Sequence, residues 1–233
     1  MTMSLRSTII FAVALASVVT QPGCLLKDAV KKITGPSPKE MVSMALDNPD
    51  PDVRREGIDL LADKKWGRQE PYLAGYRVKL HNDRDPSVRA AAARALGRAG
   101  DPKYAIDLAR ALSDKDTNVR WDVAAALDNV VSDEAIQALK TRATQDTSKD
   151  VRLCCTRALR HYPRTDVVKI YQLCLIDESF AVRHCAHQCL VEMTGEDKGD
   201  EPADWLDAAE GNMTLSGPAE PSKPWWDLFG LTN

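Results

Sequence analysis

The stretch DPSVRAAAARALGRAGD, residues 85 to 101, decides how this chain folds. Asp85 can accept hydrogen bonds from the free N–H groups of a first helical turn, and Pro86 suits the first helical position because an N–H is not needed there. Val88 and Ala92 follow at a spacing of four, so they lie on one face of a helix. The stretch predicts a helix whose small apolar residues let a neighbouring helix come close.

The pattern of this stretch recurs five times along the chain. A Val-Arg dipeptide returns every 31 to 35 residues, and a Leu stands eight residues after each Val. The dipeptides are Val53-Arg54, Val88-Arg89, Val119-Arg120, Val151-Arg152 and Val182-Arg183. A second periodic segment precedes each copy, so each unit is a helical hairpin, which cannot bury both apolar faces alone. We therefore expect an all-α fold, a right-handed α-solenoid of about five hairpins.

Two further columns of the repeat carry structural expectations. Three residues before each Val stands a side chain that can cap a helix, and seven or eight residues before it an apolar residue closes the preceding segment. The caps are Asp50, Asp85, Asp116, Ser148 and Ser179, and the closing residues are Leu46, Leu80, Leu112, Ala143 and Leu175. We expect each repeat Arg to bind carboxylates and carbonyls near the capping residue of an adjacent repeat, which is a structural role.

Two copies, DPSVRAAAARALGRAGD (85 to 101) and DTNVRWDVAAAL (116 to 127), resemble HEAT-like repeats, especially the short type of bilin-lyase subunits. The resemblance covers about residues 39–195 and implies a scaffold fold that serves unrelated functions. Tetratricopeptide and ankyrin repeats are excluded because no copy carries W-x-x-L-G-x-x-Y or T-P-L-H.

The start of the chain has the layout of an export signal. Arg6 precedes an apolar run that ends at Gln21-Pro22-Gly23-Cys24. The run is shorter than the roughly 20 residues that span a bilayer, so we expect removal of residues 1–23. Gly23-Cys24 resembles the end of a bacterial lipoprotein signal, which implies lipidation of Cys24. Gln21 stands where such signals usually carry a Leu-like residue, so an ordinary secretory signal remains the alternative.

The remaining organisation follows from the ends of the repeats. We expect a linker over residues 24–38, the solenoid over 39–195, a C-terminal cap over 196–210 and a disordered, Pro-containing tail over 211–233 with an aromatic end. TGEDKGDEPADW (194 to 205) resembles a closing motif that follows HEAT-like arrays in some exported bacterial proteins. Trp205 and Leu206 are expected to cover the apolar face of the last hairpin.

Charge and motifs narrow the function. A net charge of −3 and the lack of a basic stripe argue against a nucleic-acid partner. No Ser/His/Asp order or phosphate-binding glycine loop is recognisable. The four histidines, His81, His161, His184 and His187, are not followed by Glu, unlike those of HEAT-like di-iron hydroxylases. The sequence thus predicts a chain that is not an enzyme and carries no cofactor.

A late group of thiols and imidazoles is the one metal-like pattern. It consists of Cys154, Cys155, Cys174, His184, Cys185, His187 and Cys189. These ligand types suit zinc or copper. Cys155 and Cys189, however, stand where another copy has Ala, so packing as small buried side chains is the favoured interpretation, with metal binding and a disulfide as alternatives.

The expected function is a protein–protein interaction scaffold or adaptor in the periplasm or cell envelope, held at a membrane if Cys24 is lipidated. Trp66 and Trp121 are candidate contacts because Trp is a frequent interface anchor. The tail adds Trp225, Trp226, Leu228 and Phe229, which either dock on a partner or fold back onto the solenoid. The alternative function is a bilin-lyase-like or metal-handling protein that uses the Cys/His group.

Overall fold

The computed structural model describes residues 35–217, and the chain divides between Met41 and Val42 into two compact units. The described part of the first unit, residues 35–41, contains the start of helix α3 (Pro38–Asp47). There the Ser37 backbone N–H donates to Glu40 Oε2 (2.9 Å) and the Glu40 N–H donates to Ser37 Oγ (3.4 Å). This reciprocal capping box fixes the helix start.

The second unit, from Val42 onward, is built of consecutive helical hairpins, and residues 35–217 contain no strand. The helices after α3 are α4 (Pro51–Ala62), α5 (Tyr72–Asn82), α6 (Pro86–Ala99), α7 (Ala105–Ala111), α8 (Thr117–Leu127), α9 (Ile136–Gln145), α10 (Lys149–Ala158), α11 (Thr165–Cys174), α12 (Phe180–Thr194) and α13 (Leu206–Glu210). Short 3-10 turns precede α7, α9 and α13. Every predicted hairpin is present.

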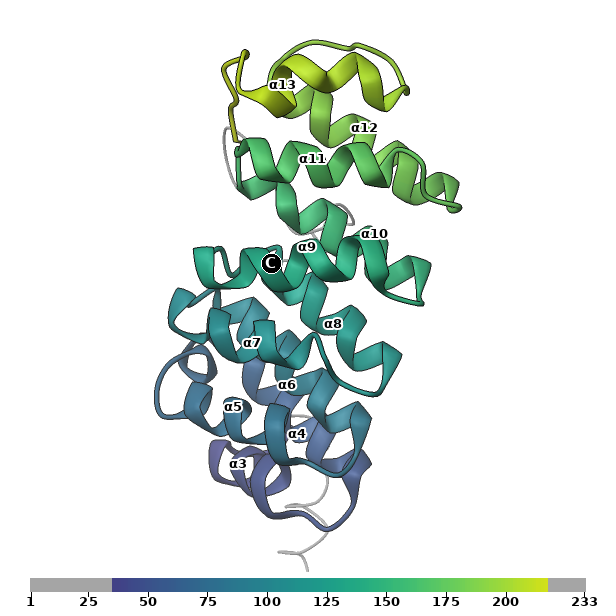
Figure 1. Cartoon of the computed structure of the whole chain (residues 1–233). Helices are drawn as coiled ribbons and strands as arrows, with labels where there is room; N and C mark the ends of the chain where they lie inside the picture. Colours follow the sequence, from purple (N-terminus) through teal and green to yellow (C-terminus); the bar gives the residue numbers. More distant parts are fainter. Residues whose placement is uncertain (1–34, 218–233) are drawn as a thin grey trace, which may run out of the picture. The chain divides into compact units, whose positions relative to one another are not determined.

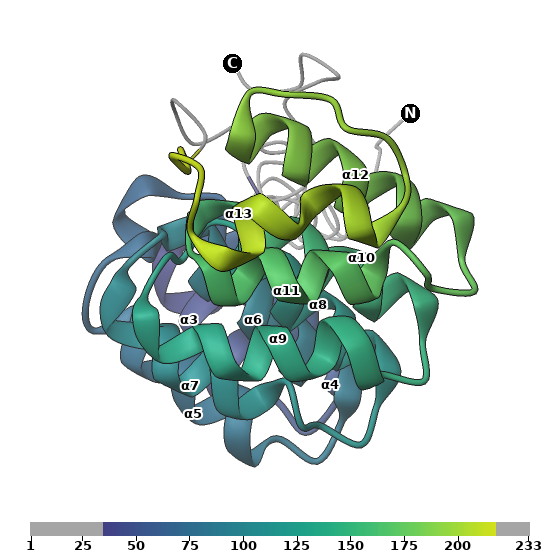
Figure 2. The same cartoon turned by 45° about the horizontal axis from the view of Figure 1, so that its top comes forward.

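The hairpins of the second unit stack in two layers (Figures 1 and 2). The second helices α4, α6, α8, α10 and α12 contact one another in succession, and the first helices α5, α7, α9 and α11 form the other layer. Each apolar face is thereby shared between neighbouring repeats. The prediction of an all-helical α-solenoid is confirmed.

The repeat columns form the core. Val88, Val119, Val151 and Val182 are fully buried, as are the Leu residues eight positions later in every copy. Val53 is only half-buried and Leu46, the apolar residue that closes the first segment, is 39% exposed. Both residues belong to the first repeat of this unit, which no earlier repeat of the unit covers.

Helix capping follows the sequence in three repeats and departs from it in two. Asp50, Asp85 and Asp116 each accept a hydrogen bond from the backbone N–H two residues later, at 2.8 to 2.9 Å. Ser148 and Ser179 occupy the N-cap position, but their hydroxyls make no capping hydrogen bond. Their own N–H groups donate to aspartates two residues earlier, so the turn is held from the preceding side. The N–H groups of the three Asp caps also donate to the side chain two residues earlier, in addition to their capping bonds.

In the segment after the last hairpin, Trp205 is buried as expected, whereas Leu206 is exposed. Trp205 is fully buried, and its indole Nε1–H donates to Gly199 O at 3.0 Å. Helix α13 contacts α11, on the first-helix layer. Leu206 is 51% exposed, so the expectation that it covers apolar surface is wrong. None of the helices within residues 35–217 is long and apolar enough to span a membrane.

Gly97 lies at a close approach between α6 and α8. A Cβ at this position would lie 2.7 Å from both Cα and Cβ of Ala126. We expect Gly97→Ala to lower the free energy of unfolding by about 1 to 2 kcal/mol, because overpacking outweighs the roughly 1 kcal/mol gained from helix propensity. Urea unfolding followed by circular dichroism measures the change.

Gly75 is the matched control for this substitution, since it also lies inside a helix. A Cβ there would meet only Leu46 Cδ2, at 3.5 Å, which is an ordinary contact. Gly75→Ala should therefore stabilise the protein by up to about 1 kcal/mol. Equal effects of the two substitutions would contradict the close helix contact at Gly97.

Candidate functional site

A ladder of arginines and aspartates joins successive repeats. In each of four repeats the Arg of the Val-Arg pair donates Nε–H and Nη2–H to one carboxylate of the next repeat, at 2.7 to 3.0 Å. The pairs are Arg54–Asp83, Arg89–Asp114, Arg120–Asp146 and Arg152–Asp177. Each Nη1 also donates to backbone carbonyls of the turn before its own helix. This fork geometry is specific to Arg.

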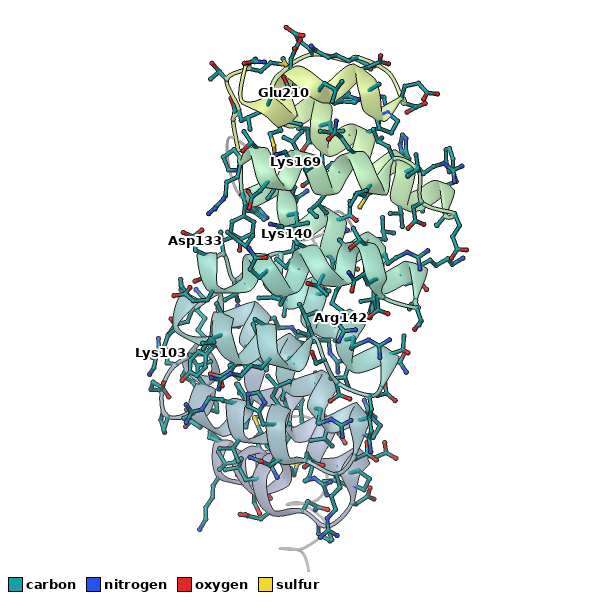
Figure 3. The ribbon with its side chains drawn as sticks, in the orientation of Figure 1. Lys103, Asp133, Lys140, Arg142, Lys169 and Glu210 are labelled. Atoms are coloured by element: carbon teal, nitrogen blue, oxygen red, sulfur yellow. The ribbon has the colours of Figure 1, made fainter. Side chains whose placement is uncertain are left out.

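The sequence placed the partners of each repeat Arg near the capping residue of an adjacent repeat, and the ladder carboxylates lie at that place. The carboxylate is not the capping residue; it lies two residues earlier, where it also accepts the N–H of the cap. Asp146 is 3% exposed, and Arg142 adds a second cation 3.6 Å from it (Figure 3). Burial opposes ionisation of Asp146, yet the hydrogen bonds from Arg120 and Ser148 and the nearby cations outweigh this effect and lower its pKa.

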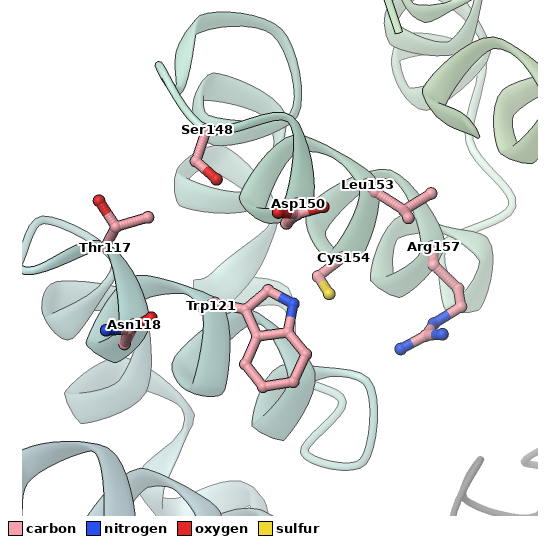
Figure 4. Close-up of a pocket in the computed structure, with 8 residues that line it drawn as sticks. All are labelled: Thr117, Asn118, Trp121, Ser148, Asp150, Leu153, Cys154 and Arg157. Atoms are coloured by element: carbon pink, nitrogen blue, oxygen red, sulfur yellow. The ribbon is translucent and has the colours of Figure 1, made fainter. Parts of the chain in front are cut away.

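A groove lies on the exposed side of the second-helix layer, between α8 and α10 (Figure 4). It has a volume of about 500 Å³. Its lining combines an aromatic ring, a thiol and charged groups: Thr117, Asn118, Trp121, Ser148, Asp150, Leu153, Cys154 and Arg157. Trp121 is 36% exposed here. An open apolar ring beside convergent polar groups is the usual composition of a binding site.

A smaller hollow of about 230 Å³ adjoins this groove, because Asn118 lines both. At its side Arg94 donates to Asp122 Oδ2 at 2.6 Å and lies 3.5 Å from Asp59. Burial raises the pKa of Asp122, although the charge of Arg94 works in the other direction. Arg94 thus links three successive repeats along one face.

At the groove's other end a half-buried carboxylate gathers three basic side chains. Asp128 lies 3.0 Å from His161, 3.3 Å from Arg160 and 3.4 Å from Arg157. Burial works against the ionised form of Asp128, but the hydrogen bond from His161 and the charges of Arg160 and Arg157 prevail and lower its pKa. Arg157 Nε is buried without a hydrogen-bond acceptor within residues 35–217, although its ion pair with Asp128 fixes the side chain at the groove.

The five late cysteines are free thiols, and four are buried. Burial raises the pKa of Cys154 and of Cys174 to about 11, and it also raises the pKa of Cys155. In Cys185 the hydrogen bond from Cys189 lowers the pKa, against the effect of burial and with help from Arg157 and Arg160. The same contact raises the pKa of Cys189. Among these thiols Cys185 therefore has the most thiolate character, and Cys154 alone lines the groove.

The structure does not bring the Cys/His residues together as one ligand set. Within residues 35–217 no three His, Cys, Asp or Glu side chains are arranged to hold a metal ion. His184 stacks on Phe180, with ring centroids 5.7 Å apart, and His187 lies 2.9 Å from Asp197. The thiols therefore divide between the core and the groove.

The other candidate residues either do not line the groove or fall outside the described residues. Trp66 packs edge-on against Tyr72 at 5.3 Å. Cys24 and the tail residues Trp225, Trp226, Leu228 and Phe229 lie outside the described residues. Sequence reasoning missed Asp122 and Asp128, whose roles depend on neighbours 28 to 33 residues away. It also missed the ladder aspartates, although an Asp five residues before each later Val was a visible signal.

Comparison with known proteins agrees with this geometry. Residues 73–160 match the family model for HEAT repeats, and no curated protein matches the chain. A solved structure, the complex of CpcE and CpcF of phycocyanin lyase from Nostoc sp. PCC7120, is similar with 22% sequence identity and a TM-score of 0.60. The match covers 70% of this chain and 68% of that one.

One expectation from the sequence must be corrected. The prediction that the chain is not an enzyme is contradicted by the similarity to a lyase complex, because the same stack of helices occurs there. At 22% identity the similarity establishes the shared fold. Residues 73–160 thus carry HEAT repeats, and the chain is built as an α-solenoid.

Proposed function

We propose that this chain is a scaffold that holds a partner protein in the groove between α8 and α10. The observation that carries the proposal is Trp121, a large aromatic side chain left 36% exposed beside Leu153 in a groove of about 500 Å³. Partly exposed aromatics in rigid surroundings are typical anchors of protein interfaces. The Arg–Asp ladder supplies the rigidity, since it fixes each repeat to the next.

We further propose that the scaffold acts in the cell envelope. This proposal rests on the export signal expected over residues 1–23 and on Cys24, which a lipid would attach to a membrane. An intact mass of the membrane-extracted protein, compared with a Cys24→Ala variant, tests it. We expect a diacylglyceryl-sized increment that the variant lacks; an uncleaved, unmodified chain would contradict export.

Binding in the groove is tested by substituting its aromatic ring. After in-cell cross-linking identifies a partner, Trp121→Ala should weaken its affinity about 30-fold, the effect of losing an anchor worth about 2 kcal/mol. Ile106→Ala is the matched control, because Ile106 is 45% exposed but lies on α7 in the other helix layer. Titration calorimetry gives both affinities. A loss of similar size in both variants would place the binding surface elsewhere.

Handling of a linear tetrapyrrole is the second candidate function, and the similarity to a phycocyanin lyase complex favours it. The groove has the volume of a small-molecule site, with Trp121 available for stacking and Arg157 for a carboxylate. With a pKa of about 11, the Cys154 thiol is almost entirely protonated at neutral pH, so we expect reversible rather than covalent binding. A red-shifted absorbance of added bilin that is lost in Trp121→Ala would support this function.

A further inference from the structure

The Arg–Asp ladder stops unfinished at the last repeat. Arg183 donates Nη1–H to Asp177 O (2.8 Å) and Glu178 O (3.1 Å). The four earlier repeat Arg residues bind the carbonyls of their own turns in the same way. Within residues 35–217, however, Nε and Nη2 of Arg183 meet no carboxylate. The only acid 25 to 29 residues later, where the other ladder partners lie, is Glu210, which accepts from Asn212 instead. One half of the Arg183 fork is thus open.

An aromatic ring lies at this open fork, and two further exposed apolar side chains stand close to it in the sequence. The Arg183 guanidinium lies 5.8 Å from the ring centre of Phe180, which is 70% exposed. Ile176 and Leu173, in the turn and at the end of α11, are 69% and 54% exposed. We call Leu173, Ile176, Phe180 and Arg183 the terminal patch; the α11 to α12 turn that carries it lies at the right of Figure 1.

The terminal patch is a departure from the repeat. The same three positions in the earlier copies hold mostly polar residues or proline. The position of Leu173 is taken by Met44, Lys79, Arg110 and Arg142, and that of Ile176 by Asp47, Asn82, Ser113 and Gln145. The position of Phe180 is taken by Pro51, Pro86, Thr117 and Lys149. Three large apolar side chains therefore gather only where the ladder lacks its acid. Such a surface suits a segment with one carboxylate flanked by large apolar residues.

The chain itself contains such a segment in PWWDLFGL, residues 224 to 231, where Asp227 stands between Trp226 and Leu228. A second copy stacked head to tail suits the patch less well. It would offer Asn48, which occupies the ladder position in the first repeat and carries no negative charge. Charge complementarity thus favours the tail.

The tail can reach the patch without strain. Ser216 N–H donates to Met193 O at 2.8 Å, so the last described residues lie beside the C-terminal end of α12. From Met193 back to Arg183 the helix spans about 15 Å. The ten residues that follow Gly217, up to Asp227, can extend over about 33 Å. The positive end of the α12 dipole, where Phe180 begins the helix, adds attraction for a carboxylate.

We propose that residues 224–231 fold back onto the terminal patch. Asp227 completes the ladder by accepting from Nε and Nη2 of Arg183, while Trp225, Trp226 and Phe229 cover Leu173, Ile176 and Phe180. The tail thereby supplies the acid and the cover that a sixth repeat would provide. This contact is independent of the groove between α8 and α10, so it can fail or hold regardless of the proposed function.

Hydrogen exchange in the full chain tests the proposal. We expect Asp227→Asn to speed exchange of the backbone amides in residues 176–183 about tenfold, because a charge-assisted hydrogen bond worth about 1.5 kcal/mol is lost. Glu220→Gln is the matched control, since it removes the same charge from the same tail and should leave exchange unchanged. Arg183→Gln should reproduce the effect of Asp227→Asn.

The charge exchange Arg183→Asp with Asp227→Arg should restore protection that either substitution alone removes. Unchanged exchange in Asp227→Asn would show that the tail does not occupy the patch and would overturn the proposal. Protection that rises with protein concentration would overturn it as well, because a second copy would then be the occupant.

Discussion

Replacing Asp146 by alanine is expected to lower the free energy of unfolding by about 3 kcal/mol, the largest effect of any single ladder residue. Its carboxylate is almost fully buried and accepts both fork hydrogens of Arg120, at 2.8 and 2.9 Å. Without Asp146 the Arg120 guanidinium, itself in a residue 8% exposed, keeps its charge and loses its counter-ion. Urea unfolding at neutral pH, followed by circular dichroism, measures the loss.

Asn48→Ala is the matched control for this prediction. Asn48 holds the same place in the first repeat and accepts the Asp50 N–H at 2.9 Å, as Asp146 accepts the Ser148 N–H. It differs from Asp146 in two ways. Its side chain is uncharged, and no repeat Arg precedes it that it could bind. We expect Asn48→Ala to cost about 1 kcal/mol, the value of one turn hydrogen bond. Equal losses in the two variants would mean that the ladder contributes nothing beyond the turn.

Trp205→Ala is the second substitution with a large expected effect, about 3 kcal/mol or more. The indole is fully buried and also donates to Gly199 O, so truncation leaves both a cavity and an unpaired carbonyl. Because repeats contact only their neighbours, the damage should stay local. We expect faster hydrogen exchange in residues 196–217 and in α11, and little change in α6.

Leu206→Ala is the matched control for Trp205→Ala. It removes an apolar side chain from the same segment, but one that is not packed in the core. Leu206 is adjacent but 51% exposed, so its truncation should alter the free energy of unfolding by less than about 0.5 kcal/mol. Uniform acceleration of exchange in α6 and α11 after Trp205→Ala would instead show that the whole stack unfolds as one unit.

Much of the fold could be predicted from local signals. Asp85 and Pro86 define a helix start through the chemistry of a first turn, and Val88 with Ala92 defines its buried face by spacing alone. Because the same signals recur about every 32 residues, stacking follows without knowledge of any contact. The ladder Arg was recognised for a related reason, since a charged residue in every copy must have a recurring partner.

The candidate site was predicted less well. Trp121 was singled out by its residue type, yet the groove around it depends on Leu153, Cys154 and Arg157 from the next repeat. The Cys/His residues looked like one cluster in the sequence, whereas helix rotation sends Cys155 and Cys174 into the core and places Cys154, itself buried, at the wall of the groove. The sequence shows which residue types are present, but the angle at which the helices pack decides which side chains meet at one site.

The sequence by itself determined the helical hairpin, its repetition and the columns that form the core, because these depend on interactions within a few residues or on a periodic pattern. The tertiary structure alone decided that Asp146 rather than the capping Ser148 receives Arg120, and that Asp128 gathers Arg157, Arg160 and His161. Those contacts join residues 26 to 33 positions apart, so they depend on the offset between stacked repeats, which no local signal encodes. Within residues 35–217 the ladder ends at Arg183, whose Nε and Nη2 meet no carboxylate there.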